Sequence, residues 1–467
     1  MKGMTLRAMT EAVNGMYHGN KDDYDKEITA ITIDSRKITD GALFVAIKGD
    51  RSDGHDFIGQ CFANGAACVI SEKELPEEKH SYIQVESSLQ ALKDLALLYR
   101  NNLDVKVVGI TGSVGKTSTK ETISSVLSEK YKVLKTLGNF NNEIGLPLTV
   151  FRLTQEDEVA VLEMGISDFG EMERLSKIAQ PDICVITNIG LCHLENLGTR
   201  DGILKAKTEI FEHMNPDGIV ILNGDDDKLV TINQVNGKRP LFFGISNQEG
   251  VYADEISNMG LEGTSFTIHG LKTSDNFSTF NVIVPVPGHH MVYNAMAAAL
   301  VGSVMGLSSI EIQQGIKNLK TIAGRNNIIK ENGYIIIDDC YNANPVSMKA
   351  SIDVLDTAVG RKVAILGDMY ELGANEKQLH YDVGMYLATK DIDVLITAGH
   401  LADNIASGTK DYIRTHYNAS ECEVHSFDTR DDMLKCIGQI LKKNDNILIK
   451  ASHGMEFTKV VEAVKTL

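Results

Sequence analysis

The residues best suited to chemistry follow a short apolar run in the first third of the chain. After Val105–Ile110 the sequence reads Thr111-Gly112-Ser113-Val114-Gly115-Lys116-Thr117-Ser118. Its two glycines let backbone N–H groups converge on phosphate oxygens without Cβ clashes. Lys116 can reach β- and γ-phosphates, and the Thr117 hydroxyl can ligate Mg²⁺. The pattern predicts a loop that binds the phosphates of ATP or another nucleoside triphosphate; the alternative is a glycine-rich turn that binds nothing.

Two further strand ends carry side chains that could bind a metal ion. Glu163 lies near the end of the apolar run Val159–Met164, and a carboxylate at the carboxyl end of a parallel strand faces the crevice where ligands bind. It could hold Mg²⁺ directly or through water, or it could be a solvated glutamate. His193 follows the run Ile183–Thr187 in a loop, where a histidine is more often a surface residue. The adjacent Cys192 has no second cysteine or histidine at metal-ligand spacing, so we expect it to be a small packing residue.

A polar loop precedes the strand that carries the glutamate. Between Gly138 and Gly145 it contains Asn139, Asn141 and Asn142. Amide side chains both donate and accept hydrogen bonds, which suits amide or sugar ligands. Asn139 and Asn142 are therefore candidate substrate contacts, with a polar surface loop as the alternative.

A second group of strand-end loops lies in the last third of the chain. Asn344, followed by a proline, suits the N-cap of a helix, which leaves Asp339 and Asn342 without a structural explanation. Residues 367–369 and 450–454 also follow predicted strands. We expect these loops to gather at one edge of a sheet and to face the nucleotide across a cleft.

Alternating strand and helix patterns predict the elements that position these loops. Such alternation implies a doubly wound, mostly parallel sheet in the centre and a second βα series from about residue 321. Residues 249–287 break the alternation and predict an antiparallel extension. The chain is therefore expected to be α/β with three domains, at residues 1–102, 103–320 and 321–467, the first small and the last Rossmann-like. The expected strands are Ile28–Ile33, Ala42–Ile47, Ala67–Ile70, Val105–Ile110, Val159–Met164, Ile183–Thr187, Ile219–Asn223, Tyr334–Asp338, Lys362–Leu366, Val394–Thr397 and Ile447–Lys450, and the expected helices include Lys116–Lys130, Pro345–Ala358, Glu376–Ala388 and Met433–Lys443.

Composition argues against several classes of protein. The 467 residues include 46 Lys+Arg and 63 Asp+Glu, a net charge of −17, and an acidic surface repels nucleic acid and anionic membranes. Seven cysteines without a CxxC pair argue against a disulfide framework or a zinc ribbon and favour a reduced, intracellular chain. The most apolar stretch, Met291–Leu307, is too short for a bilayer span of about 20 residues and predicts a buried helix instead.

Taken together, the motifs resemble those of the Mur ligases, ATP-dependent amide-forming enzymes of peptidoglycan synthesis, over essentially the whole chain. The phosphate loop has the family's T-G-S-x-G-K-[ST] form, with Ile110 where the Walker pattern has its first glycine. The stretches Asp34–Arg36 and Gly41–Gly49 resemble the family's UDP-sugar-binding domain. The family's late Lys-Gly-Ser-Arg stretch here reads Lys450–His453, with His453 replacing the arginine.

The resemblance implies a role for each candidate residue. The nucleotide-binding residues would be Thr111, Gly112, Ser113, Val114, Gly115, Lys116, Thr117, Ser118, Asn294, Arg325 and Asp339. Two Mg²⁺ ions would be held by Thr117, Glu163, His193 and Lys207, the last carboxylated by CO₂. Judged without the resemblance, a lysine on a polar helix face is more often solvated. The substrate contacts would be Ser35, Arg36, Lys48, Asn139, Asn142 and Asn342, and the catalytic groups Lys116, His193 and Lys207.

The implied activity joins D-alanyl-D-alanine to UDP-N-acetylmuramoyl-tripeptide with ATP, in a cytoplasmic monomer without membrane insertion or nucleic-acid binding. One alternative is a related Mur or folylpolyglutamate-type ligase that adds a single amino acid, although the D-N-P-R motif of the diaminopimelate-adding member is missing. The other is a P-loop switch that hydrolyses ATP slowly to control a partner.

Overall fold

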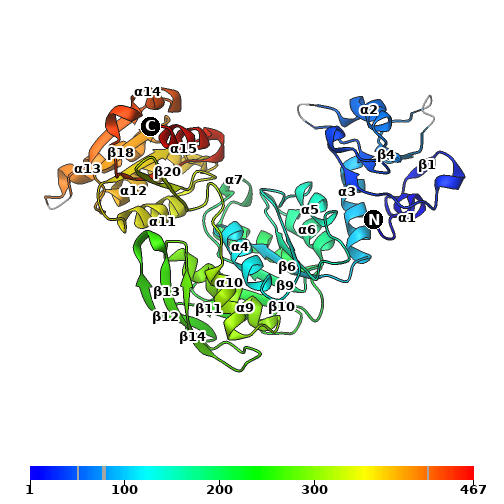
Figure 1. Ribbon diagram of the computed structural model, residues 1–467, viewed down its shortest axis with the longest axis horizontal. Coiled ribbons are helices and arrows are strands. Elements are labelled where there is room, and N and C mark those ends of the chain that lie inside the picture. The colour runs from blue at the N-terminus through cyan, green and yellow to red at the C-terminus, as the bar shows by residue number, and fades with distance from the viewer. Residues whose placement is uncertain (50–51, 76–79, 418–419) are drawn as a thin grey trace. The chain divides into compact units, whose positions relative to one another are not determined.

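The computed structural model describes residues 1–49, 52–75, 80–417 and 420–467. Its strands form three sheets, of five, nine and six strands, which follow one another along the chain (Figure 1). The predicted α/β class with three domains is confirmed. The chain also divides into two compact units whose bounds differ from those of the three sheets. One unit comprises residues 1–111, 131–185 and 206–220, and the other comprises residues 112–130, 186–205 and 221–467.

The first sheet builds a small amino-terminal domain. Its strand order is β1-β5-β4-β3-β2, and neighbouring strands are parallel except β1 and β5. Helix α2 packs on the sheet through an apolar core that includes Phe44, Phe62 and Val69. The strands are β1 (Met16–His18), β2 (Ile31–Thr32), β3 (Leu43–Val45), β4 (Cys68–Ser71) and β5 (Tyr82–Gln84), and the helices are α1 (Leu6–Ala12), α2 (Ile58–Ala63) and α3 (Ser88–Asn101).

The second sheet has the order β14-β13-β12-β11-β10-β9-β6-β8-β7. Strand β8 pairs in parallel with both β6 and β7, whereas β12, β13 and β14 are antiparallel, which confirms the predicted extension. The strands are β6 (Lys106–Thr111), β7 (Val133–Lys135), β8 (Val159–Glu163), β9 (Ile183–Ile186), β10 (Ile219–Asn223), β11 (Leu241–Gly244), β12 (Val251–Asn258), β13 (Thr264–His269) and β14 (Thr279–Val284). The helices are α4 (Lys116–Leu127), α5 (Gly145–Val150), α6 (Glu171–Ala179), α7 (Leu194–Leu197), α8 (Arg200–Thr208), α9 (His290–Val304) and α10 (Ser309–Lys317).

Helix α9 is the predicted buried helix, and most of its residues from Met291 to Gly302 are inaccessible to solvent. Among the residues that the structure describes, no helix is both long enough and apolar enough to cross a bilayer.

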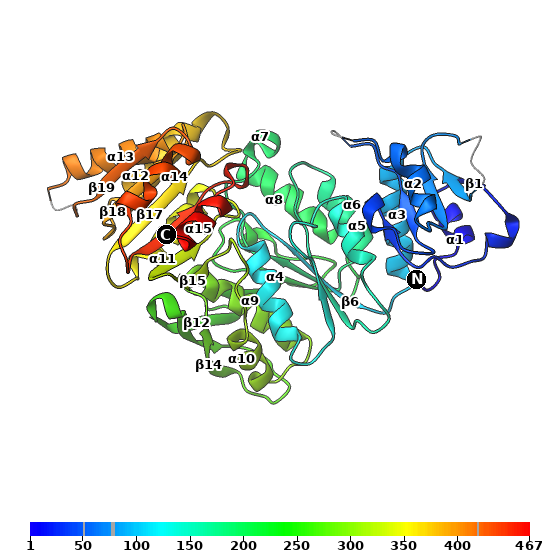
Figure 2. The ribbon, with the colours of Figure 1, turned by 45° about the horizontal axis from the view of Figure 1, so that its top comes forward.

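The third sheet has the order β15-β16-β20-β17-β18-β19 and is parallel except for the β15–β16 hairpin. Along β17, Val363 and Ile365 belong to one apolar core with α14 and α15, while Ala364 and Leu366 belong to a second core with α11, α12 and α13. Helices therefore cover both faces, as a doubly wound sheet requires (Figure 2). The strands are β15 (Asn327–Glu331), β16 (Tyr334–Asp338), β17 (Lys362–Gly367), β18 (Val394–Ala398), β19 (Glu423–Phe427) and β20 (Asn446–Lys450), and the helices are α11 (Pro345–Asp356), α12 (Glu376–Leu387), α13 (Asp403–Thr415), α14 (Arg430–Ile440) and α15 (Thr458–Lys465).

Helices α12 and α13 approach each other so closely that only glycine fits at their contact. A Cβ on Gly384 would lie 2.0 Å from the Ile405 carbonyl oxygen, and one on Gly408 would lie 2.2 Å from that of Tyr381. The Thr409 hydroxyl also donates a hydrogen bond to the Gly384 carbonyl, at 3.1 Å. The backbones are thus in direct contact across this helix pair.

We predict that Gly384→Ala lowers the free energy of unfolding by about 2–3 kcal/mol, because the added methyl group must push α12 away from α13. Gly59→Ala is the control, since a Cβ at Gly59 in α2 meets open space. Urea and thermal unfolding followed by circular dichroism would measure both variants. A Gly384→Ala protein as stable as the parent would contradict this packing.

Candidate active site

The predicted phosphate loop joins β6 to α4 and lies tightly against the segment that follows β9. Gly112 has φ +147°, and a Cβ there would lie 1.9 Å from Thr187 Oγ1. Asn188 accepts a hydrogen bond from Ser113 N through its carbonyl and one from Val114 N through its side chain, both at 3.0 Å. The Thr187 hydroxyl donates to the Val114 carbonyl at 2.6 Å. The loop conformation is therefore fixed by Thr187 and Asn188, whose roles the motif itself does not reveal.

The first turn of the helix after the loop has no side-chain cap. The N-cap of α4 is Gly115, at φ +84°, which has no side chain to occupy the first amide groups of the helix. The Lys116 ammonium donates to the Gly112 carbonyl at 2.8 Å, so it folds back over the loop. Thr117 is buried at the first turn of the helix. These features fit a triphosphate, as the sequence predicts.

Asn294 lies beside the same loop. Its Oδ1 accepts a hydrogen bond from the Thr119 hydroxyl at 3.0 Å, and a Cβ on Gly115 would lie 3.4 Å from that oxygen. The side chain is 5% exposed, so Asn294 contributes to the packing of α9 against α4.

Glu163 ends β8 opposite Ile110, the residue directly before the phosphate loop in sequence. It is only 2% exposed, so the interpretation as a solvated glutamate is wrong. Its carboxylate accepts a hydrogen bond from Asn141 Nδ2 at 2.9 Å, and its backbone N–H donates to Thr136 Oγ1 at 3.0 Å. A buried carboxylate held in one orientation is a suitable ligand for a divalent cation.

The polar loop at 136–145 therefore braces Glu163. Asn141, one of its three asparagines, provides the contact, and spacing alone could not single it out. The Asn142 side chain accepts a hydrogen bond from Gly145 N at 2.8 Å and so closes the turn that enters α5. Asn139 is exposed and available to a ligand.

Lys207 lies near the end of α8 and is 1% exposed. The interpretation as a lysine on a solvated helix face is therefore wrong. Burying an ammonium group is costly unless it is paired or chemically modified. The position is consistent with the carboxylated lysine that the family resemblance implies.

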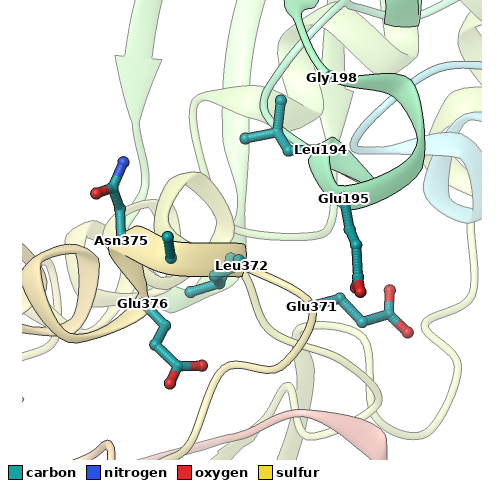
Figure 3. A pocket seen from close by; sticks show the side chains of 9 residues that line it. Leu194, Glu195, Gly198, Glu371, Leu372, Asn375 and Glu376 are labelled. Carbon is teal, nitrogen blue, oxygen red and sulfur yellow. The ribbon is translucent and has the colours of Figure 1, made fainter.

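His193 is the N-cap of the short helix α7, with φ +50°. Its Nδ1 lies 3.5 Å from Oε2 of Glu371, in the loop after β17. A pocket of about 670 Å³ adjoins this pair between α7 and residues 371–376. Figure 3 shows the side chains of Glu195 and Glu371 at this pocket, so its lining carries two carboxylates. Cys192 is only partly buried, and its sulfur lies 3.2 Å from Ser113 Oγ, so it packs against the phosphate loop.

The strand-end loops of the third sheet meet at one edge, as predicted. The backbone N–H of Ser452 donates to the Asp368 carbonyl at 3.0 Å, and the Ser452 hydroxyl accepts from Tyr370 N at 2.9 Å. Lys450 Nζ lies 2.5 Å from Asp339 Oδ2, and both side chains are buried. Asn344 caps α11, with Pro345 as its first residue.

The remaining candidates differ in their accessibility. Asp339 is 7% exposed and engaged in the ion pair, whereas Asn342 is exposed at the same edge. Arg325 lies with its guanidinium carbon 4.1 Å from the centre of the Tyr341 ring.

In the amino-terminal domain Ser35 begins a short 3₁₀ helix, and both Arg36 and Lys48 are exposed. Arg36 forms a two-point ion pair with Asp34, at 2.8 and 2.9 Å. This contact lowers the pKa of the Asp34 carboxyl to about 2. Arg36 and Lys48 are accessible to a diphosphate, as their predicted role requires.

Comparison with known proteins covers all three domains. The family models "Mur ligase family, catalytic domain", "Mur ligase middle domain" and "Mur ligase, glutamate ligase domain" match residues 27–100, 110–302 and 324–453, respectively.

Relatives and solved structures agree with these matches. The chain is 38% identical to the UDP-N-acetylmuramoyl-tripeptide–D-alanyl-D-alanine ligase of Bacillus subtilis, covering 98% of this chain and 97% of that protein. It is also similar to the crystal structure of MurF from Acinetobacter baumannii, with a TM-score of 0.88, 32% identity and 99% of each chain covered. MurF from Thermotoga maritima in complex with ADP gives a TM-score of 0.80 at 32% identity, covering 94% of this chain and 97% of that one. The chain belongs to the Mur ligase family.

Proposed function

We propose that this chain is an ATP-dependent ligase that joins D-alanyl-D-alanine to UDP-N-acetylmuramoyl-tripeptide and so completes the pentapeptide precursor of peptidoglycan. The observation that supports this most is its 38% identity, over nearly the full length of both chains, to a ligase named for that reaction. The phosphate loop supplies the site for the ATP that the reaction consumes. The expected setting is the cytoplasm, with the enzyme a monomer.

The proposed reaction has two steps. The terminal carboxylate of the tripeptide attacks the γ-phosphate of ATP, which gives an acyl phosphate and ADP. The neutral amine of D-alanyl-D-alanine then attacks the acyl carbon, and inorganic phosphate leaves as the amide forms and the nitrogen loses one of its two protons. Catalysis consists mainly of positioning and charge neutralisation. Lys116, which folds over the loop, would turn toward the γ-phosphate and stabilise the charge that develops on it.

Mg²⁺ would be held by Thr117, Glu163, His193 and Lys207. The buried, braced carboxylate of Glu163 fits a divalent cation. The burial of Lys207 fits a carbamate, which would present oxygens instead of an ammonium to a second ion. When bound, the ions would neutralise phosphate and carboxylate charge. Asn141 would keep the Glu163 carboxylate in one orientation, and Thr136 would hold the Glu163 backbone.

The three domains would divide the substrates among them. We assign residues 1–102 to the UDP-sugar, with Ser35, Arg36 and Lys48 at the diphosphate. Residues 103–320 would bind ATP, with Asn294 near the base and Asn139 and Asn142 toward the tripeptide. Residues 321–467 would complete the site, and there Arg325, Asp339 and Asn342 are the candidate contacts to ATP and the dipeptide. The Asp339 carboxylate is buried in its ion pair. We therefore propose that Asp339 acts on the nucleotide indirectly, by holding the neighbouring loop in place.

A substrate panel tests this function against both alternatives. The purified protein is given ATP and either UDP-N-acetylmuramoyl-dipeptide or UDP-N-acetylmuramoyl-tripeptide, with single amino acids or D-alanyl-D-alanine, and ADP release is measured. We expect turnover with tripeptide and D-alanyl-D-alanine together. ADP release with a single amino acid would favour another Mur or folylpolyglutamate-type ligase, and ADP release without any acceptor would favour a switch.

We predict that Lys116→Met reduces kcat by at least about 100-fold, because the charge developing on the γ-phosphate loses its nearest cation. Lys132→Met is the matched control, since Lys132 is exposed and paired with Glu156 outside the loop. Coupled measurement of ADP release, with circular dichroism to verify folding, gives the result. Release at the parent rate by Lys116→Met would exclude the assigned role.

The modification of Lys207 can be observed directly. In ¹³C-bicarbonate buffer, the parent protein should show a carbamate carbon signal by NMR that Lys207→Met lacks. Lys205→Met should retain the signal, because Lys205 is exposed on the same helix. The same signal in Lys207→Met would place the carbamate elsewhere, and a parent protein without the signal would exclude a stable carbamate.

A further inference from the structure

The turn that carries Arg325 is fastened to the end of β16 by two carboxylates. Gly324 N donates to Asp338 Oδ2 at 2.7 Å, and Asn326 N donates to Asp339 Oδ1 at 3.1 Å. Arg325 lies between these two anchors, and its own N–H donates to the Ile322 carbonyl at 3.1 Å. The backbone at Arg325 is therefore held on both sides.

Asp339 is itself held from the opposite side. Its Oδ2 accepts hydrogen bonds from Lys450 Nζ at 2.5 Å and from the Ser351 hydroxyl at 2.6 Å. Lys450 is 2% exposed and also donates to the Asn342 carbonyl at 3.1 Å. A buried pair with these additional bonds has little freedom to move, since breaking it would leave an uncompensated charge. The turn is thus fixed to the sheet.

Tyr341 provides the surface on which the Arg325 side chain lies. The guanidinium carbon is 4.1 Å from the ring centre, and Tyr341 N donates to the Gly324 carbonyl at 3.1 Å. Gly324 has φ +79°, and a Cβ there would lie 3.1 Å from Tyr341 Cβ, so the close approach of turn and tyrosine favours glycine. His453 contacts the same ring, with 5.5 Å between ring centres.

One N–H donor of the stacked guanidinium has no acceptor in the described part of the chain. This donor is Arg325 Nε, which is buried. A guanidinium stacked on an aromatic face keeps its N–H groups in one plane, and the terminal Nη groups in that plane can make bidentate contact with a phosphate. A lysine at this position would provide neither a planar group nor the paired donors that bidentate contact requires.

We propose that Tyr341 is a positioning residue, which fixes the plane of Arg325 through their cation–π contact so that Arg325 can receive the phosphates of the nucleotide. This inference rests on the proposed nucleotide role of Arg325. It adds a residue that would not touch the substrate itself. His453, where the family motif has an arginine, packs against the same ring and supports its orientation.

The test compares Tyr341→Leu, which removes the ring, with Tyr341→Phe, which keeps it. We expect Tyr341→Leu to lower kcat/KM for ATP about 3- to 30-fold, the range that a cation–π contact supports, with KM for UDP-N-acetylmuramoyl-tripeptide and D-alanyl-D-alanine unchanged. Tyr341→Phe should stay within about twofold of the parent, because the aromatic face is retained. An equal loss toward all substrates, with a lowered melting temperature, would show a merely structural role and overturn the proposal.

Variants of Arg325 separate this inference from the function on which it rests. If Arg325→Ala has parent kinetics, the nucleotide role of Arg325 is wrong; if it is impaired while Tyr341→Leu is not, only the positioning role is wrong. Millimolar guanidinium chloride should partly restore Arg325→Ala, and it should fail when Tyr341→Leu is added. Should Tyr341→Leu not fold, Arg325→Lys decides, because parent kinetics with lysine would show that a fixed plane is unnecessary.

Discussion

The direct contact between Gly112 and Thr187 determines the shape of the phosphate loop. A Cβ at Gly112 would overlap the Thr187 hydroxyl, which donates to the Val114 carbonyl. Asn188 completes the attachment by accepting from two loop amides. The loop is therefore held by the segment after β9, and the direction of the Lys116 and Thr117 side chains depends on that attachment. An alanine at 112 would separate the two segments and disturb the loop amides that Asn188 holds.

Two acidic side chains, one in each compact unit, are held in place in a similar way. The carboxylate of Glu163 is held by Asn141, and that of Asp339 by Lys450 and Ser351. Each acid lies at the end of a parallel strand, or one residue beyond it, and each is fixed by a residue from a neighbouring segment. Buried charge without such partners would destabilise the fold, so the bonds that stabilise these loops also keep their geometry constant.

Local patterns predicted much of the fold and the phosphate loop. The bounds of β10 and β16 match the predicted strands, and Asn344 caps α11 as expected, because period, cap and turn signals are local. Long-range contacts were not predictable. Lys450 and Asp339 are separated by 111 residues, and no spacing rule pairs them. A lysine on a polar helix face is more often solvated, whereas tertiary packing buries Lys207. In the 136–145 loop, only the folded chain distinguishes Asn141, which donates to the Glu163 carboxylate, from Asn139, which is exposed.

Transfer of oxygen from the tripeptide to phosphate is the most direct test of the proposed chemistry. UDP-N-acetylmuramoyl-tripeptide labelled with ¹⁸O in its terminal carboxylate is turned over with ATP and D-alanyl-D-alanine, and the inorganic phosphate is analysed by mass spectrometry. An acyl phosphate intermediate predicts one ¹⁸O atom in each phosphate released, because the carboxylate oxygen that attacks the γ-phosphate leaves with it. Unlabelled phosphate, formed together with the amide product, would contradict activation through an acyl phosphate.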